Sequence, residues 1–266
     1  MKKPHLVRHL ISAALLVSTA CGLWAESETL AHIRQRDRLI VGTEMVFPTF
    51  NFKDPATGRN EGFMADLARA FAKRLLGDER KVEFRKTDDA TRLDYVARGD
   101  VDVLIDTIPP SAEKEKVVDF SDETFRSGSA LLVKRGSAVK TIDDIKPGMR
   151  VAFVTANPDV KVIREKVPGV TYLEFEKSPE AVAALKGGRA DVFTQVVTHL
   201  YRAASQDAGF VVTGSFTSKP YAVALKKGDT EMRTAVNDFL KAFRASGDYD
   251  RLFAKWFSAY GGGAMR

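Results

Sequence analysis

Residues 99–103 read Gly-Asp-Val-Asp-Val, and 89 positions later residues 188–192 read Gly-Arg-Ala-Asp-Val. In both places a predicted helix ends at the glycine, and a predicted strand contains an aspartate three residues further on. Glycine adopts the left-handed conformation of a helix end at little steric cost. Two such junctions at equivalent positions indicate two similar α/β lobes. A common helix-to-strand turn that occurs twice is the alternative explanation.

Strand and helix patterns alternate on both sides of these junctions. Alternating or β-branched apolar runs predict strands over residues 38–43, 82–84, 101–105, 130–133, 151–154, 172–175, 190–195 and 221–225. Helical spacing predicts helices over residues 67–75, 91–97, 159–166, 179–185 and 232–243, followed by an apolar cluster at residues 252–257. This alternation predicts an α/β fold whose sheets are mainly parallel.

The composition is that of an ordinary globular protein. The chain has 266 residues, of which 44% are hydrophobic and 29% are charged, and it contains one cysteine. Such a composition excludes a disordered, collagen-like or disulfide-rich chain and leaves room for two modest domains. A single cysteine forms no intramolecular disulfide and supplies no multi-cysteine metal site.

The amino terminus has the features of an export signal. Lys2, Lys3 and Arg8 precede an uncharged, mostly apolar run over residues 10–24. This run is shorter than the ~20 residues that span a bilayer, but it suits the apolar region of a secretory signal. We therefore predict a signal peptide over residues 1–25 and a periplasmic protein; a buried core helix is the alternative.

Cys21 offers a second possibility for the same segment. The residues from Ser18 to Cys21 are similar to a lipoprotein cleavage box, but serine stands where a leucine is expected. Lipid attachment at Cys21 is therefore the less favoured alternative. Cleavage after Ala25 instead leaves a mature chain without cysteine, which is indifferent to an oxidising compartment.

The charge balance excludes nucleic acid as a partner. The chain has 41 Lys and Arg against 35 Asp and Glu, and loss of the signal leaves 38 against 35, a net charge of +3. Nucleic-acid binding requires a clustered basic face, whereas these charges alternate along the chain.

Five short motifs occur in the order that one known family shows. The family's opening strand and aromatic-proline turn correspond to residues 42–50, with Thr49 in place of a second proline. Its other motifs are Gly-Phe-x-x-Asp-Leu at residues 62–67, Gly-x-x-Asp at 99–102, Asp-Phe-Ser at 119–121 and Lys-Trp-Phe at 255–257. From about Leu39 to Phe257 the chain resembles bacterial extracellular solute-binding proteins of the polar amino-acid transport type (family 3).

The resemblance implies a periplasmic binding protein-like fold of type II, with two similar α/β lobes joined by a two-strand hinge. By analogy lobe 1 is discontinuous, with residues 26–122 plus 222–266, and lobe 2 comprises residues 129–217. The hinge segments are then residues 123–128 and 218–221. The resemblance also implies a monomer that closes on a small polar ligand, an amino acid or related compound, and delivers it to a membrane ABC permease. Neither a cofactor nor a metal ion is implied.

Ligands of open α/β sheets bind beyond the carboxyl ends of the strands, and several predicted strands end in polar residues. In the first lobe these include Asp106 and Thr107. The resemblance places the ring of Phe47 against the ligand's side chain and the carboxylate of Glu44 at its far end. A core ring behind the turn and a solvated loop acid are the alternative roles for these two residues.

The family's main anchor is altered in this chain. The resemblance implies an arginine shortly before the Asp-Phe-Ser motif that binds the ligand's α-carboxylate, and Lys114 occupies that position. Lysine supplies the charge without the bidentate fork of arginine. Pro109 also removes a backbone donor close to this position.

The second lobe departs further from the family pattern. A glycine-rich turn that offers amides to the carboxylate corresponds to residues 155–159, where Asn157 is the candidate ligand contact and Asp159 would repel an anion. Val196 replaces the acid that holds the α-ammonium group, which leaves Gln195 as the nearest polar candidate. A standard α-amino-acid ligand is therefore not supported by the anchors. The charges of Glu44, Asp88, Asp89 and Asp106 favour a cationic or hydroxyl-rich ligand.

Two other functions compete with solute transport. A periplasmic partner or sensor protein with an altered ligand site fits the missing anchors. A dehydratase-like enzyme on the same fold is the less favoured alternative, because the four histidines, at positions 5, 9, 32 and 199, form no evident catalytic set. We therefore predict that the chain is not an enzyme.

Overall fold

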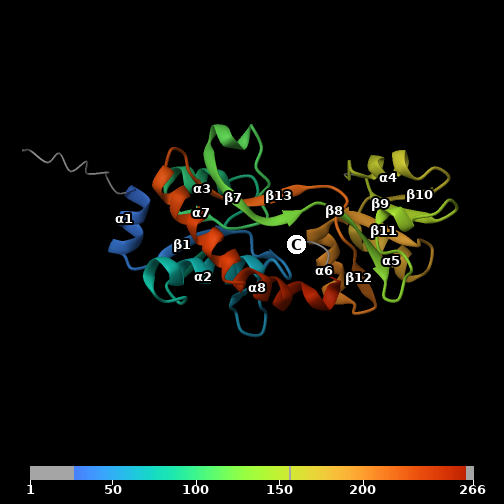
Figure 1. Cartoon of the computed structure of the whole chain (residues 1–266), viewed down its shortest axis with the longest axis horizontal. Helices are drawn as coiled ribbons and strands as arrows, with labels where there is room; N and C mark the ends of the chain where they lie inside the picture. Colours follow the sequence, from blue (N-terminus) through green and yellow to red (C-terminus); the bar gives the residue numbers. More distant parts are fainter. Residues whose placement is uncertain (1–26, 156, 262–266) are drawn as a thin grey trace, which may run out of the picture.

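The computed structural model describes residues 27–155 and 157–261, which form two lobes joined by long strands (Figure 1). The predicted signal peptide and Cys21 lie outside the described residues. Within the described part of the chain, no helix is long and apolar enough to cross a membrane.

The first lobe contains a five-stranded sheet, which in spatial order consists of β5 (Val82–Lys86), β1 (Leu39–Thr43), β6 (Val103–Leu104), β13 (Lys219–Lys226) and β7 (Val118–Ser127). Its helices are α1 (Glu28–Gln35), α2 (Phe63–Leu76), α3 (Arg92–Arg98), α7 (Thr230–Ala245) and α8 (Asp248–Phe257), with short 3-10 turns η1 (Lys114–Lys116) and η3 (Ser258–Tyr260). A small sheet of β2 (Val46–Phe47), β3 (Asn51–Lys53) and β4 (Asn60–Glu61) adjoins them.

Side chains that alternate along β1 separate the two faces of this sheet. Ile40 packs with Val96 of α3 on one face. Leu39 and Val41 belong to the larger core on the other face, which includes residues of α2, α7 and α8. The lobe is therefore a sheet between two helical layers.

The second lobe repeats this plan. Its sheet consists, in spatial order, of β10 (Thr171–Phe175), β9 (Arg150–Val154), β11 (Val192–Val196), β8 (Ser129–Lys134) and β12 (Phe210–Val212). Its helices are α4 (Val160–Lys166), α5 (Ser178–Lys186) and α6 (Val197–Gln206), and η2 (Ile142–Asp144) is a 3-10 turn. The prediction of two α/β lobes is confirmed.

Both sheets are mixed, so the expectation of mainly parallel strands was too strong. In the first lobe β5, β1 and β6 are parallel, whereas β13 and β7 add antiparallel pairs. In the second lobe β10, β9 and β11 are parallel, and β8 and β12 are antiparallel additions. The parallel strands are joined through helices, whereas the added strands include those that carry the chain between the lobes.

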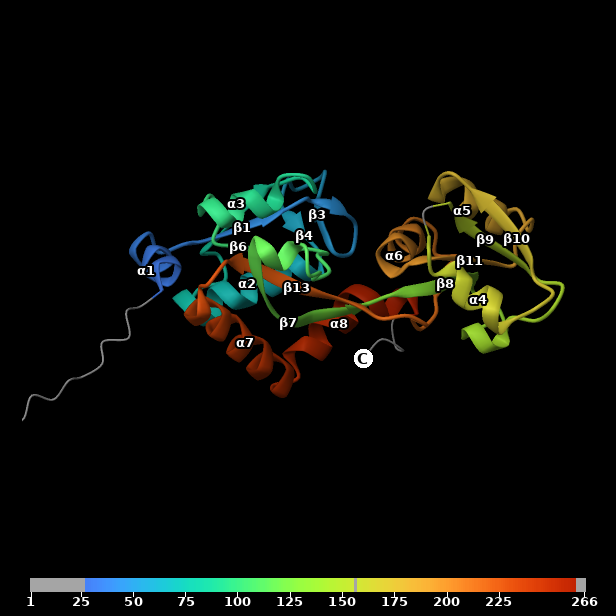
Figure 2. The same cartoon turned by 90° about the horizontal axis from the view of Figure 1, so that it is seen from above.

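The chain crosses between the lobes along two adjacent strands (Figure 2). β7 belongs to the first sheet and β8 to the second, and Gly128 lies between them. A side chain at Gly128 would collide with the carbonyl oxygen of Thr217, 2.0 Å from an ideal Cβ. Glycine therefore allows the outgoing and returning segments to approach closely. β13 returns the chain to the first sheet beside β7.

The two Gly-x-x-Asp junctions have the same local structure. Gly99 and Gly188 both have a positive φ, of 78° and 72°. The carboxylate of Asp102 accepts a hydrogen bond from the Ile40 amide in β1, and that of Asp191 accepts one from the Arg150 amide in β9. Each aspartate thus joins its own junction to the first parallel strand of its sheet.

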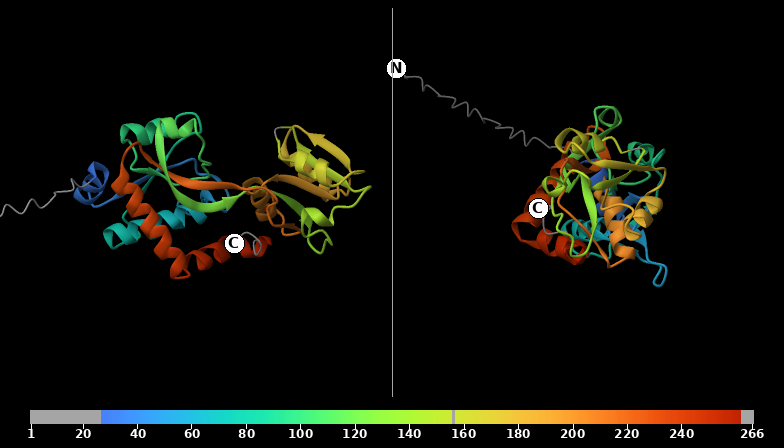
Figure 3. Two further views of the ribbon diagram at one scale, coloured as in Figure 1. Left: turned by 45° about the horizontal axis from the view of Figure 1, so that its top comes forward. Right: turned by 90° about the vertical axis from the view of Figure 1, so that its right-hand side faces the viewer.

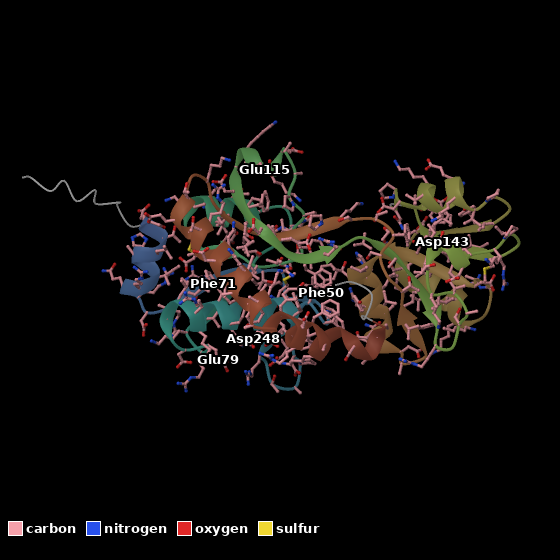
Figure 4. All side chains as sticks on the ribbon, viewed as in Figure 1. Phe50, Phe71, Glu79, Glu115, Asp143 and Asp248 are labelled. Carbon is pink, nitrogen blue, oxygen red and sulfur yellow. The ribbon has the colours of Figure 1, made fainter. Side chains whose placement is uncertain are left out.

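Aromatic rings fill the part of the first lobe that faces the hinge. Phe50, labelled in Figure 4, is fully buried, and its ring centroid lies 4.9 Å from that of Phe125 and 5.0 Å from that of Phe257. Tyr201, from α6 of the second lobe, packs on Phe257 at 4.6 Å. The aromatic cluster therefore includes residues of both lobes.

The end of the described chain forms a further contact between the lobes. α8 and η3 run beneath the crossing strands (Figure 3, left), and Arg135 donates a hydrogen bond to the carbonyl oxygen of Ala259 at 3.1 Å. The apolar residues 252–257 were predicted as a cluster, and the structure shows that they lie on a helix. Gly247 follows the end of α7, as predicted, and also precedes α8.

Candidate functional site

A cavity of about 350 Å³ lies where the two lobes face each other beside the crossing strands. The first lobe contributes residues from the ends of β1 and β6, from β2 and from the start of α3. The second lobe contributes residues at the start of α6, and β13 contributes two more. The lining residues are Glu44, Phe47, Asp89, Arg92, Thr107, Pro109, Val196, Thr198, His199, Lys219 and Tyr221. We call this cavity the cleft.

Glu44 faces a cation inside the cleft. Its Oε1 atom lies 3.2 Å from Nη1 of Arg92, and the two side chains are only 14% and 7% exposed. Arg92 also binds Asp89, three residues earlier. Burial raises the pKa of Glu44, as does the nearby Asp106, whereas Arg92 lowers it. Glu44 is therefore a paired carboxylate, not a solvated loop acid.

Phe47 spans the cleft toward the second lobe. Its ring meets that of His199 edge to face, with centroids 5.6 Å apart and an interplanar angle of 89°. Burial and the neighbouring Arg202 lower the pKa of His199, so that its imidazole is neutral at neutral pH. The two rings form an apolar wall that joins the lobes.

Asp106 lies beneath the cleft and does not line it. It is 2% exposed, and its carboxylate accepts hydrogen bonds from Oγ1 of Thr43 at 3.1 Å and from the amides of Glu44 and Thr107, both at 2.7 Å. Burial raises its pKa, and the two amide hydrogen bonds oppose that shift. Asp106 therefore fixes the backbone of two residues that face the cleft.

Lys114 lies behind the lining residue Pro109. Its Nζ atom donates a hydrogen bond to the carbonyl oxygen of Pro109 at 2.8 Å. Burial lowers its pKa, and the positive charge of Arg92 lowers it further. The described contacts of Lys114 are thus with the first lobe itself.

Asn157 and Gln195 are both buried in the second lobe and are not among the lining residues. Asn157 donates to the carbonyl oxygen of Thr194 at 3.2 Å and accepts from the amide of Asp159 at 3.1 Å. Oε1 of Gln195 accepts from the amide of Val196 at 2.9 Å. Of the seven residues predicted for the site, Glu44, Phe47 and Thr107 line the cleft.

Sequence reasoning did not single out Arg92 or Lys219. Arg92 lies 48 positions after its partner Glu44, in the first turn of a helix where a charged residue normally faces solvent. Lys219 lies inside the predicted hinge segment 218–221, but nothing in its neighbours marks it as facing the cleft. The sequence signal for Arg92, a basic residue three positions after Asp89, is too common to be informative.

The described residues contain no cluster of three or more His, Cys, Asp or Glu side chains suited to a metal ion. A larger groove of about 930 Å³ lies on the first lobe, between α2, α7 and α8. Its Asp66 is already bound by Arg69, Lys255 and the indole of Trp256. This groove lies away from the strand ends and the hinge, so the cleft is the better candidate for the ligand site.

The family model of the bacterial extracellular solute-binding proteins, family 3, matches residues 39–259. Two curated relatives bind glutamine. The ABC transporter glutamine-binding protein GlnH of Bacillus subtilis is 35% identical, over 96% of this chain and 97% of its own. The glutamine-binding protein of Geobacillus stearothermophilus is 38% identical, over 76% of this chain and 78% of its own.

Solved structures show the same fold. An ancestral cationic amino acid solute-binding protein is 35% identical and aligns with a TM-score of 0.71 over 86% of this chain and 99% of its own. An ancestral cyclohexadienyl dehydratase is 29% identical and aligns with a TM-score of 0.69 over 87% and 97%. The chain belongs to the bacterial extracellular solute-binding proteins of family 3, and it captures a small solute for delivery to an ABC transporter.

Proposed function

We propose that the cleft binds a zwitterionic amino acid with a neutral polar side chain, and that L-glutamine is the first candidate. The balance of charge in the cleft carries this proposal. Among the lining residues the two carboxylates, of Glu44 and Asp89, are both paired with Arg92, and the second lining cation, Lys219, is paired with Asp159 behind the lining. A ligand with no net charge suits such a site, because it leaves neither a cation nor an anion unpaired.

The acidic residues alone favoured a cationic or hydroxyl-rich ligand, and that prediction remains untested; the contacts of two of these residues favour a ligand without net charge instead. Glu44 is paired with Arg92, and the carboxylate of Asp106 is occupied by main-chain amides. The glutamine-binding relatives support the same conclusion, in spite of the altered family anchors.

We assign the ligand's contacts as follows. The ring of Phe47 packs against its aliphatic part, and Glu44 with Arg92 offers an acceptor and a donor to a terminal amide, while Thr107 supplies a further polar group. Asn157 and Gln195 bind their own backbone here and would contact the ligand only if closure of the lobes exchanged these partners. Lys114, behind Pro109, adds positive charge nearby, and Asp106 holds the strand end. Closure occurs by bending at the hinge segments 123–128 and 218–221.

In this proposal the protein acts as a monomer in the periplasm after removal of residues 1–25. Its closed, ligand-bound form is the one that the permease recognises. The protein has no catalytic activity, in contrast to the ancestral dehydratase that shares its fold. The carboxylate of Glu44, which lines the cleft, is paired with a cation 3.2 Å away and is therefore poorly placed to accept a proton as a general base.

Isothermal titration calorimetry of residues 26–266 tests this function. L-Glutamine should bind, whereas L-arginine, L-glutamate, sugars and polyamines should bind at least tenfold more weakly. At 100 times its dissociation constant, L-glutamine should add about 2.7 kcal/mol to the free energy of unfolding. Binding of a polyamine in preference to any amino acid would overturn the ligand assignment. Turnover of a cyclohexadienyl acid would favour the enzyme, and the absence of any ligand would favour the partner or sensor protein.

A further inference from the structure

In the second lobe, the turn that the resemblance predicts to bind an anion carries the carboxylate of Asp159, which lies outside the lining of the cleft. The amide of Asp159, at the start of α4, donates to Oδ1 of Asn157 within the same turn. The side chain of Asp159 then points back to the crossing strands. The main-chain amide of Asp159 is therefore already used within the turn and is not available to an anionic group of a ligand.

Three donors surround the Asp159 carboxylate. Oδ2 accepts from Oγ of Ser129 at 2.7 Å and from Oγ1 of Thr217 at 3.2 Å, and Nζ of Lys219 lies 3.2 Å from it. Burial raises the pKa of Asp159, but these donors outweigh burial and lower the pKa overall. The carboxylate is thus charged, and two neutral hydroxyl groups hold it together with the lysine.

Lys219 belongs to the hinge and to the cleft at the same time. Its backbone pairs with Ser127 of β7 at the crossing between the lobes, and its side chain lines the cleft together with Arg92 and Tyr221. The side chain is 40% exposed, whereas that of Asp159 is 12% exposed. The ammonium group is therefore accessible from the cleft, and the flexible lysine stem allows it to change partner.

An exchange of partner at Lys219 costs little. An exposed ion pair contributes about 0–1 kcal/mol, and this pair, with Lys219 40% and Asp159 12% exposed, falls at the upper end of that range. Asp159 retains Ser129 and Thr217 as donors when the lysine leaves, so its carboxylate does not become unsatisfied. Arg92, the other lining cation, is already bound to Glu44 and Asp89. Lys219 is the more available cation for a carboxylate that enters the cleft.

We propose that Lys219 binds the ligand's carboxylate and gives up its ion pair with Asp159 to do so. This inference rests on the proposed function, that the ligand is an amino acid. Lys219 thereby takes the place of the altered anchors, Lys114 in the first lobe and the turn at residues 155–159 in the second. Because Lys219 is part of the hinge strand, the exchange also connects the occupied cleft to the segment that bends.

Calorimetry with two ligands and a matched variant tests the assignment. L-Glutamine carries the carboxylate, and L-glutamine α-amide replaces it by a neutral group while retaining the ammonium group and the side chain. Lys226→Met is the control for Lys219→Met, because Lys226 is on the same strand, is 42% exposed and pairs with Glu28 outside the cleft.

Lys219→Met should weaken L-glutamine binding about 10–100-fold, as expected for loss of a charge-assisted hydrogen bond. It should not weaken binding of the α-amide, which carries a net positive charge and gains from the loss of a neighbouring cation. Lys226→Met should leave both affinities within about twofold of those of the wild type, since it removes no contact assigned to the ligand. Equal losses for both ligands, or an unchanged affinity for L-glutamine, would overturn the inference. A wild-type protein that binds no amino acid would instead refute the proposed function.

Asp159→Asn should change the affinity for L-glutamine in the opposite direction to Lys219→Met. Removal of the competing carboxylate should tighten L-glutamine binding severalfold, because Lys219 no longer has to leave an ion pair. The gain should vanish in the double variant with Lys219→Met. A gain that persists there would show that Asp159 acts on the ligand directly and not through the lysine.

Discussion

The aspartates of the two Gly-x-x-Asp junctions differ in their surroundings, although both receive a main-chain amide from a parallel strand. Asp102 of the first lobe is 6% exposed, and Asp191 of the second is 32% exposed. Burial raises the pKa of Asp102 in spite of its hydrogen bonds from Ile40 and Arg36. The side chain of Arg150 lowers the pKa of Asp191. The same backbone motif thus places one carboxylate in a core and the other near the surface.

The strand ends beside these junctions also differ between the lobes, in whether their polar residues organise the lining of the cleft. In the first lobe, buried Asp106 organises a strand end that lines the cleft at Glu44 and Thr107. In the second lobe, Asn157 and Gln195 bind their own backbone neighbourhood. The two lobes therefore share a fold, but the first lobe supplies most of the residues that line the cleft.

The largest effect should come from the buried strand end of the first lobe. Asp106→Ala leaves two amides and one hydroxyl group without their acceptor, so the free energy of unfolding should fall by about 3 kcal/mol or more. Gln195→Ala, at the second lobe's strand end, removes one acceptor and should cost about 1 kcal/mol. Urea unfolding followed by circular dichroism measures both. Equal losses would contradict the difference between the lobes.

A second comparison concerns the arginine of each lobe. Arg92→Met removes the cation beside Glu44 and should raise the dissociation constant for L-glutamine roughly 10–100-fold. Arg150→Met removes the cation beside Asp191, outside the cleft, and should change it less than about twofold. Calorimetry at neutral pH measures both constants, and a similar loss for the two variants would show that Arg92 acts through stability alone.

A fall in pH should change the contributions of Asp191 and Asp102 to the free energy of unfolding in opposite directions. The folded-state pKa of Asp191 is lowered, so its charged form stabilises the fold above the unfolded-state pKa, and this contribution is lost as the pH falls through the folded value. The folded-state pKa of Asp102 is raised, so its charged form costs stability, and that cost is relieved as the pH falls.

Asp191→Asn should therefore lose less stability than the wild type between neutral and acidic pH, whereas Asp102→Asn should lose more. Urea unfolding of the three proteins across this range gives the two difference curves. If both variants differed from the wild type in the same direction as the pH falls, the folded-state pKa values of the two aspartates would be shifted in the same direction, against this account.

The smallest effect concerns two tyrosines, one at each end of the second lobe. The hydroxyl groups of Tyr201, in the aromatic cluster, and Tyr172, on β10, are buried without a hydrogen-bond partner among the described residues. Tyr201→Phe and Tyr172→Phe should therefore cost no more than about 0.5 kcal/mol, and removal of the fully buried hydroxyl of Tyr201 should raise the melting temperature. A loss above about 1 kcal/mol at Tyr201 would reveal a partner for its hydroxyl.

The fold could be predicted because its signals are local. Neighbouring residues suffice to identify a glycine at a helix end, the period-two pattern of a strand and the period-four pattern of a helix. These patterns predicted two α/β lobes. The antiparallel strands at the sheet edges were not evident, since strand direction depends on where the chain returns in space. β6 covers only Val103–Leu104 of the predicted strand at residues 101–105, although the amides of Asp102 and Ile105 also donate to carbonyl oxygens of β1.

The site could be predicted only where a residue follows a strand or a recognisable turn. Glu44, Phe47 and Thr107 do so, and they line the cleft. Arg92 and Lys219 reach it from a helix start and from the hinge, through ion pairs with residues 48 and 60 positions away. Pairs at such separations have no periodic signature, so the cations that balance the cleft become visible only in three dimensions.

Small-angle X-ray scattering tests most directly the claim that the two lobes close on an amino acid. With saturating L-glutamine, the radius of gyration of residues 26–266 should fall, because hinge bending brings the lobes together, and Lys219→Met should need a higher concentration for the same change. A scattering curve that stays the same when calorimetry shows the cleft to be occupied would contradict the account.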